Sequence, residues 1–275
     1  MALYIFTTSK DFSVELIREE ATKQSLDCFV YFYADLVFKR NILVYKDKQS
    51  IQIGRKDRII LRDPYQEGNF SLLLKKILKK FKGNILLDSQ CLTSYPSYED
   101  KLFQAKFFRK NKICIPKTCY GKQISKISSF PIIVKKRISS RGKGNILLKN
   151  SKELNEFLNF RDIRQYIAQE YQKAETDYRI LILKEKVLGI VNRKVKFKRD
   201  KSIKVKVQKG LNKLPSQVTK DALKISKKLG ADFVGIDVLL SQGKYYFLEA
   251  NLSPQFKGFV RATGINVAKK IIKLV

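Results

Sequence analysis

Residues 231–254, "ADFVGIDVLLSQGKYYFLEANLSP", contain the pattern that decides the fold. Two apolar runs flank a short polar stretch, and this arrangement predicts a β-hairpin. A three-residue loop over 242–244 would place Asp237 directly opposite Glu249. A two-residue loop would instead offset the two acids and turn them to opposite faces of the sheet. The chemistry of the hairpin therefore depends on its register.

With the three-residue loop, Asp237, Glu249 and Asn251 share one face of the hairpin, because alternate residues of a strand point the same way. Two facing carboxylates repel each other unless something positive lies between them. Two carboxylates and an amide oxygen suit a hard cation such as magnesium with bound phosphate. The alternative is two exposed acids at a sheet edge, and the apolar flanks of both strands weigh against it.

The composition excludes several kinds of active site. The 275 residues include no histidine, which rules out a Ser/His/Asp or Cys/His triad, a histidine base and histidine-ligated zinc. Any metal must be held by oxygen, which points to magnesium or manganese. The four cysteines match no zinc spacing and are expected to be reduced thiols. No apolar run approaches the ~20 residues of a membrane span, and the N-terminus reads as a strand rather than a secretion signal, so we expect a cytoplasmic protein.

The net charge is strongly positive, since 57 Lys and Arg oppose 25 Asp and Glu, which gives +32. Such a charge favours an acidic partner: nucleic acid, the ribosome, a nucleotide or an acidic peptide. The alternative is a lysine-rich composition in which most lysines simply solvate the surface.

The order of apolar patterns predicts an α/β (α+β) protein in two parts. Residues 1–90 alternate strands with helices, as a small parallel-sheet domain does, and a new helix at 96–111 with Ser97 as its cap opens the second part. The expected strands are 2–7, 28–33, 50–63, 84–89, 130–137, 166–171, 178–184 and 186–198, and the other expected helices are 11–24, 70–83, 150–160, about 215–230 and 266–274.

Two further stretches are weak signals when each is taken alone, and they become informative only together with the hairpin. In "FPIIVKKRISSRGKGN" (130–145) an apolar strand delivers Lys135 before a small-residue loop, whose backbone N–H groups could approach phosphate. A flexible, lysine-rich turn explains that stretch equally well. In "YIAQEYQKAETDYRI" (166–180) a strand runs into Gln169, Glu170 and Tyr171, and Asp177 and Arg179 then alternate on a new strand.

In their order and spacing these stretches resemble the ATP-grasp superfamily, and specifically the RimK-like glutamate ligases. The resemblance covers 96–275 and reaches the first 95 residues only through their α/β pattern. It implies an ATP-grasp fold with an N-terminal Rossmann-like domain (1–95) and an ATP-grasp domain (96–275), divided into a lid (96–168) and a catalytic subdomain (169–275). The stretches that carry it are "DKL" (100–102), "PIIVKK" (131–136), "AQEY" (168–171), "DYR" (177–179), "DFVGIDVL" (232–239), "LEANLSP" (248–254) and "TGINVA" (263–268).

The resemblance also implies a role for each matching residue. Lys101 and Lys135 would contact the phosphates of ATP. Arg179 would contact the transferring phosphoryl group. The loop residues that would fold over the phosphates are Ser139, Ser140, Arg141, Gly142 and Gly144. The adenine hinge would be Gln169, Glu170 and Tyr171, and Asp177 would reach the ribose side. One or two magnesium (or manganese) ions would be bound by Asp237, Glu249 and Asn251.

The sequence departs from the family pattern in the region that helps to select the acceptor. Here the chain reads "KVKVQKGL" (204–211), so that Lys204 and Lys206 stand at phosphate-contacting positions and Gln208 replaces a histidine. "SPQF" likewise replaces the usual Ser-Pro-Gly. Residues 193–213 carry ten Lys or Arg against one Asp. This charge predicts a funnel for an anionic carboxylate substrate, or else a solvated hairpin.

The expected function is an ATP-dependent carboxylate–amine ligase that forms an amide through an acyl phosphate. The resemblance implies glutamate, or a related amino acid, as the amine and an acidic protein or peptide C-terminus as the acceptor. Alternatives are a peptide-modifying ligase with a different acceptor, a basic RNA- or ribosome-binding module without ligase activity, and a phosphotransferase that stops at the phosphorylated product.

Overall fold

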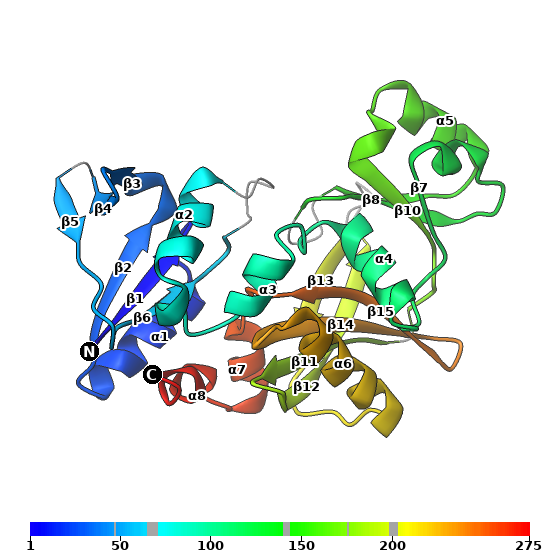
Figure 1. Ribbon diagram of the computed structural model, residues 1–275. Coiled ribbons are helices and arrows are strands. Elements are labelled where there is room, and N and C mark those ends of the chain that lie inside the picture. The colour runs from blue at the N-terminus through cyan, green and yellow to red at the C-terminus, as the bar shows by residue number, and fades with distance from the viewer. Residues whose placement is uncertain (47, 65–70, 140–143, 175, 198–202) are drawn as a thin grey trace.

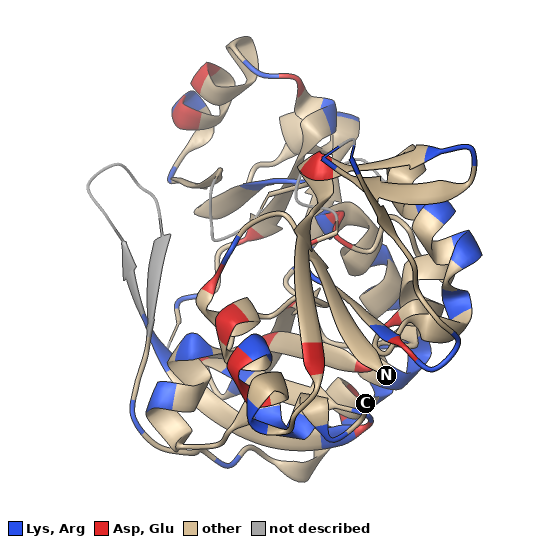
Figure 2. Cartoon of the chain, turned by 90° about the vertical axis from the view of Figure 1, so that its left-hand side faces the viewer, with Lys and Arg blue, Asp and Glu red and all other residues tan. Residues whose placement is uncertain are grey.

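The computed structural model describes residues 1–46, 48–64, 71–139, 144–174, 176–197 and 203–275. It has an N-terminal α/β part, a large antiparallel sheet, and a small sheet unit set to one side (Figure 1). The two ends of the chain lie side by side, because helix α8 (Val267–Ile272) packs against helix α1 (Phe12–Lys23) (Figures 1 and 2). In the part of the chain that is described, no helix is long and apolar enough to cross a membrane.

The N-terminal part contains the predicted parallel sheet, in the order β2-β1-β6. Asp11 caps α1, since its carboxylate accepts hydrogen bonds from the N–H groups of Ser13 and Val14. A separate antiparallel sheet has the order β3-β4-β5. The elements are β1 (Ala2–Thr7), α1, β2 (Asp27–Phe32), β3 (Leu36–Lys39), β4 (Ile42–Tyr45), β5 (Gln49–Ile51), β6 (Arg58–Leu61), α2 (Leu72–Lys80) and α3 (Ser89–Ser94), with 3₁₀ helices η1 (Tyr33–Asp35) and η2 (Lys82–Asn84).

Two strand predictions in this part were wrong. The stretch 50–63 divides between β5 and β6, which belong to different sheets. The strand expected at 84–89 is reduced to a single parallel bridge between Ile59 and Ile85. The stretch turns away there because Asp88 adopts a left-handed conformation (φ 61°), which few residues other than glycine tolerate.

Asp88 instead joins the N-terminal part to the large sheet. Its Oδ1 accepts hydrogen bonds from the backbone N–H groups of Asp232 (2.6 Å) and Phe233 (2.9 Å). The carboxylate of Asp232 accepts from the N–H of Asp88 in return (2.9 Å). Burial raises the pKa of Asp88 to about 8, although the N–H group of Phe233 opposes the shift. This reciprocal link is therefore buried, and it contains a carboxyl group whose pKa lies near neutral pH.

The small sheet unit, residues 118–170, packs a core of its own. Its strands have the order β7-β10-β8-β9. Helix α5 covers them, capped by Asn150, whose side chain accepts from the N–H of Glu153 at 3.0 Å. The elements are β7 (Thr118–Tyr120), η3 (Gly121–Lys126), β8 (Ile132–Lys136), β9 (Asn145–Leu148), α5 (Ser151–Asn159), η4 (Ile163–Gln165) and β10 (Tyr166–Glu170).

Helix α4 (Lys101–Lys110) precedes this unit but packs on the large sheet. The side chain of Gln104 donates to the carbonyl of Ala250 and accepts from its N–H, both at 2.9 Å. The predicted cap at Ser97 was wrong, because residues 97–100 form a turn and Asp100 accepts from the N–H of Leu102 at 2.9 Å. The predicted domain boundaries stay predictions. The residues of α4 pack against the large sheet and not within the small sheet unit.

The large sheet is antiparallel throughout, in the order β13-β12-β11-β14-β15. Helix α6 packs against β11 and β12, and Gly230 ends it in the left-handed conformation. A shared core joins this sheet to the N-terminal part. The elements are β11 (Thr176–Leu183), β12 (Lys186–Phe197), β13 (Ile203–Val207), α6 (Ser216–Leu229), β14 (Phe233–Ser241), β15 (Lys244–Asn251), α7 (Lys257–Thr263) and α8.

Candidate active site

The β14–β15 hairpin places Asp237 directly opposite Glu249, as predicted, but by a different route. The turn has two residues, Gln242 (φ 49°) and Gly243 (φ 69°), both in the left-handed region, and not three. On its own such a turn would offset the two acids. A β-bulge at Leu248 restores the pairing, since the register shifts by one residue between Asp237 and the next position of β14.

Asp237 is neutralised by two arginines from neighbouring strands. Arg179 on β11 donates to both carboxylate oxygens, from Nε to Oδ1 at 2.7 Å and from Nη2 to Oδ2 at 2.9 Å. Arg193 on β12 reaches the same carboxylate, with Nη2 3.0 Å from Oδ2. The positive charge that two facing acids require is therefore supplied, at Asp237, by these two arginines.

Arg193 also contacts Asp177, which lies opposite it in the β11–β12 register. All three of Asp177, Arg193 and Asp237 are buried. Burial acts to raise the pKa of Asp237, but Arg179 and Arg193 outweigh it and hold that pKa below its ordinary value. Burial raises the pKa of Asp177 to about 6, because Asp237 adds repulsion and the attraction of Arg193 and Arg179 does not fully offset the loss of water. The two acids of this network therefore differ in their readiness to ionise.

Lys135 on β8 faces this network, and Lys101 on α4 lies close to Lys135. Burial lowers the pKa of Lys135 to about 8, and the carboxylates of Glu249, Asp177 and Asp237 act against that shift. Lys101 at the start of α4 donates to the carbonyl of Ser139 at 2.7 Å and to its Oγ at 3.3 Å. The small sheet unit thus contributes a cation to the acids of the large sheet.

The predicted loop is only partly within the described residues. Ser140, Arg141 and Gly142 lie outside them. Ser139 contacts Lys101, and Gly144 has φ 78°, a conformation that L side chains rarely adopt. The carbonyl of Gly144 accepts from the N–H of Lys136 at 3.3 Å, which closes the β8–β9 turn.

The predicted hinge lies at the end of β10, beside the site. The N–H of Glu170 donates to the carbonyl of Lys117 (2.9 Å) and that of Tyr171 to the carbonyl of Pro131 (3.1 Å). Both N–H groups are thus engaged, and adenine would use carbonyls of this segment. The buried amide of Gln169 donates to Thr118 Oγ1 at 3.0 Å, and its Oε1 has no hydrogen-bond partner. Asp177, expected near the ribose, pairs with Arg193, and its predicted role stays a prediction.

Lys204 and Lys206 lie on β13, where they pair in register with Lys196 and Lys194 of β12. The pairing continues one position beyond β13, because the N–H of Gln208 donates to the carbonyl of Asn192, next to Arg193, at 3.0 Å. In Figure 2, Lys and Arg positions occur on helices at both sides of the molecule, so the positive charge is not confined to this hairpin.

The predicted metal ligands have oxygen atoms with capacity to spare. Oδ1 of Asp237 accepts one hydrogen bond, Oδ1 of Asn251 accepts one from the N–H of Ser253 (2.8 Å), and Glu249 forms no ion pair with any described residue. Each such oxygen has two acceptor positions. Among the described residues no cluster of three His, Cys, Asp or Glu side chains could hold an ion, and this set has two carboxylates and an amide. The donor set therefore fits magnesium.

The sequence reasoning missed residues that support this set. Glu99 lies close to Glu249 and Lys101, and burial raises its pKa to about 7 although a hydrogen bond with Tyr98 opposes the rise. Its position in "YEDKL", directly before a matched motif, was the signal that could have found it. Arg193 had no such local signal, because its contact with Asp237 depends on the order of the strands in the sheet.

Ser253 links the end of β15 to the N-terminal part. Its Oγ accepts from the N–H of Asp63 at 2.8 Å, while its own N–H donates to Asn251. The neighbouring Arg62 is buried, and its Nη2 donates to the carbonyls of Ser253 (3.4 Å) and Pro254 (3.3 Å). Its Nε and Nη1 are buried without hydrogen-bond partners. Asn251 is thus held by a turn fixed from the other part of the molecule.

Residues 99–275 match the model of the RimK-like ATP-grasp domain. The chain belongs to the RimK-like ATP-grasp family. This match begins two residues before α4 and includes every predicted site residue, and it confirms the family resemblance read from the sequence.

Solved structures and curated relatives agree with this assignment. The ATP-grasp ligase PsnB, solved with a minimal precursor, superposes with a TM-score of 0.73 at 14% identity, over 100% of this chain and 97% of PsnB, which confirms the predicted ATP-grasp fold. A probable alpha-L-glutamate ligase of Legionella pneumophila (strain Corby) is 28% identical over 191 residues, 64% of this chain and 62% of that protein. The coenzyme gamma-F420-2:alpha-L-glutamate ligase of Methanocaldococcus jannaschii is 31% identical over 185 residues, 62% of this chain and 64% of that protein. The chain thus spans less than two thirds of each curated relative.

Proposed function

We propose that this RimK-like ATP-grasp protein is an ATP-dependent carboxylate–amine ligase. A carboxylate oxygen of the acceptor attacks the γ-phosphorus of ATP, and ADP leaves with the electrons of the broken P–O bond. An amine then attacks the acyl phosphate, an amide forms, and phosphate leaves while the amine loses a proton. The observation that carries the proposal is the position of Asp237, which lies between Arg179 and Arg193 and opposite Glu249.

Each charged group has a proposed task in this reaction. Lys101 and Lys135 bind the phosphates of ATP, and Arg179 stabilises the negative charge that the transferring phosphoryl group carries. Arg193, which reaches Asp237 from β12, helps to keep its carboxylate ionised. Phosphoryl transfer of this kind needs charge neutralisation and positioning more than a covalent catalyst, which agrees with a chain without histidine.

Asp237, Glu249 and Asn251 would hold one or two magnesium ions, which when bound neutralise the phosphate oxygens of ATP. The oxygen-only donor set supports this choice, since no nitrogen or sulfur ligand takes part in it. The raised pKa of Asp177 distinguishes it from Asp237, the acid that stays ionised beside the arginines.

The proposed substrates are glutamate, or a related amino acid, and an acidic protein or peptide C-terminus. Two curated relatives bear the name of glutamate ligases, and PsnB was solved with a precursor. The β12–β13 hairpin brings Lys194 and Lys196 into register with Lys206 and Lys204, which suits an anionic acceptor. We keep Lys204 and Lys206 as proposed contacts of the reacting anions.

The test is an ADP-release assay with glutamate and acidic C-terminal peptides, followed by mass spectrometry of the peptide. We expect ADP and a peptide heavier by glutamate residues. Asp237→Asn and Glu249→Gln should each abolish both products, while Glu156→Gln, which changes an exposed acid on α5, should leave them unchanged. The ligase proposal fails if no carboxylate supports ADP formation. ADP and a phosphorylated product without any amide would show a phosphotransferase instead.

A further inference from the structure

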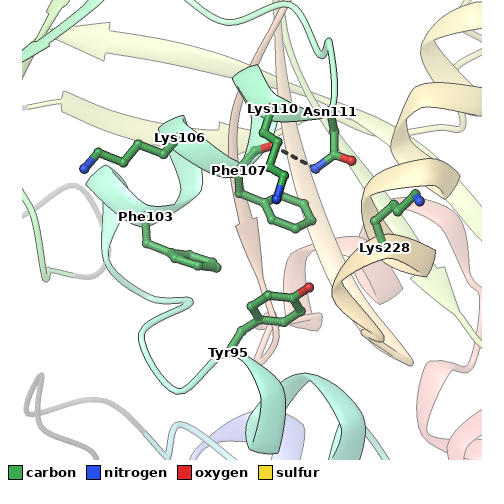
Figure 3. A pocket seen from close by; sticks show the side chains of 7 residues that line it. All are labelled: Tyr95, Phe103, Lys106, Phe107, Lys110, Asn111 and Lys228. Atoms are coloured by element: carbon green, nitrogen blue, oxygen red, sulfur yellow. Dashed lines mark hydrogen bonds between the residues drawn. The ribbon is translucent and has the colours of Figure 1, made fainter.

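A cavity lies on the outer side of α4, away from the acids of the site. It has a volume of about 410 Å³ and lies between α4, the end of α3 and the end of α6 (Figure 3). We name it the α4–α6 pocket. Its lining residues are Tyr95, Phe103, Lys106, Phe107, Lys110, Asn111 and Lys228.

The floor of the α4–α6 pocket is aromatic. The ring of Tyr95 lies 5.6 Å from that of Phe103 and 5.7 Å from that of Phe107, at interplanar angles of 46° and 74°. All three side chains are half-buried. Phe103 and Phe107 stack against each other, with ring centroids 6.0 Å apart and an interplanar angle of 27°, so the three rings contact one another and form a continuous apolar surface. Such a floor suits an inserted apolar side chain.

The rim of the pocket is positive. Lys106, Lys110 and Lys228 are exposed, and none of them forms an ion pair with a described residue. Lys106 extends away from the three rings in Figure 3, and its ammonium lies 4.8 Å from the centroid of the Tyr120 ring. Lys110 and Lys228 close α4 and α6, whose C-termini together contribute roughly one negative charge. Three full positive charges exceed that amount, so the rim attracts anions.

One helix separates the pocket from the candidate active site. The side chain of Gln104 on α4 contacts the backbone of Ala250, which lies between Glu249 and Asn251. Phe103 and Phe107 lie on either side of Gln104 in the sequence and line the pocket instead. A helix is about 10 Å across, and an extended chain covers that distance in roughly three residues. A peptide held in the pocket therefore needs only a short further stretch to reach the site.

We infer that the α4–α6 pocket docks an acidic segment of the peptide acceptor that carries an apolar side chain. The apolar side chain lies on Tyr95, Phe103 and Phe107, and the flanking carboxylates pair with Lys110 and Lys228. The docked segment precedes the carboxylate that reacts, so the pocket raises acceptor affinity without touching the reacting atoms. This inference rests on the proposed ligase function for its acceptor.

The direct test is fluorescence anisotropy with a labelled synthetic peptide in which glutamates surround one phenylalanine, without ATP. Lys110→Glu combined with Lys228→Glu should weaken binding about tenfold, because two attractive contacts become repulsive. Phe103→Ala should weaken it several-fold, and so should serine in place of the peptide's phenylalanine. The matched control, Lys23→Glu with Lys79→Glu, changes the net charge equally at exposed positions on α1 and α2 and should bind as the unchanged protein does.

Equal binding by both double variants would overturn the inference, and so would a response to polyuridylate but not to the peptide. Kinetics separate the inference from the proposed function. With a long acidic acceptor, the Lys110/Lys228 variant should show a raised KM and an unchanged kcat, and with a dipeptide acceptor it should match the unchanged protein. Ligation without any effect of these variants refutes docking and leaves the ligase proposal standing. Peptide binding that depends on them, without any ligation, supports docking and refutes the ligase proposal.

Discussion

Nη2 of Arg193 lies 3.0 Å from Oδ2 of Asp237, although strand β11 runs between the strands that carry them. The guanidinium reaches across β11 and contacts Asp177 there as well. One buried cation therefore holds acids from two strands, and the geometry of the candidate metal ligand Asp237 depends on a residue two strands away.

Arg193→Met should destabilise the protein by about 3–5 kcal/mol, because it leaves two buried carboxylates with too little positive charge. The measurement is the free energy of unfolding in urea at neutral pH. The control is Arg164→Met, since Arg164 pairs with Asp162 with 84% of its side chain exposed, and it should cost no more than about 1 kcal/mol. Equal losses in the two variants would show that Arg193 does not hold the network.

ATP binding should weaken as the pH rises through about 8, the pKa to which burial lowers Lys135. Below that pH the lysine is charged and can bind phosphate, and above it the affinity should fall by up to about tenfold per pH unit. Calorimetric titration with Mg-ATP between pH 7 and 9.5 measures the effect. Lys135→Arg should remove the pH dependence, because arginine stays charged, whereas Lys136→Arg at the exposed neighbouring position should retain it. A pH dependence that survives in Lys135→Arg would contradict the assignment.

Asp88 should make the protein less stable as the pH rises. Its pKa in the folded protein, about 8, lies above its ordinary value, so the folded state retains a proton that the unfolded state releases. This contribution is complete below about pH 4 and is lost as the pH approaches 8. In Asp88→Asn the amide oxygen can still accept from Asp232 and Phe233, and the negative slope of unfolding free energy against pH should decrease by up to about 1.4 kcal/mol per pH unit. Asp27→Asn, at an exposed position, should leave the slope unchanged.

Ser253→Ala should raise the magnesium concentration needed for half-maximal activity. The change removes the hydroxyl that accepts from the N–H of Asp63 and loosens the turn that holds Asn251. The expected loss of stability is about 1 kcal/mol, as for the loss of one hydrogen bond. Ser216→Ala at an exposed position of α6 serves as the control. An unchanged magnesium requirement, with the stability loss present, would show that the turn does not position Asn251.

The hairpin shows how far the sequence could predict the site. Apolar alternation predicted that Asp237 and Glu249 lie on one buried face, and the structure pairs them. The turn was mispredicted because Gln242 adopts a left-handed conformation that is unusual outside glycine and asparagine. The bulge at Leu248 compensates for it, and no local pattern in "YYFLEAN" announces a bulge.

Arg193 and Asp88 show what local patterns leave out. The contact of Arg193 with Asp237 crosses a strand, so it depends on sheet order and not on spacing in one element. The link of Asp88 with Asp232 joins residues 144 positions apart, and no helix or strand period relates them. The strand expected at 84–89 failed for the same reason, since its residues serve this long-range link. Family motifs placed the site, and tertiary contacts decided its details.

The separate core of the small sheet unit has a consequence for how the protein melts. Ile124, Val134 and Leu154 pack among residues of that unit alone, whereas the N-terminal part and the large sheet share their cores. Loss of the smaller core would remove Lys135 from the site while the acids and arginines of the large sheet stayed folded. Heat should therefore abolish nucleotide binding at a lower temperature than it abolishes most of the secondary structure, in two resolvable steps.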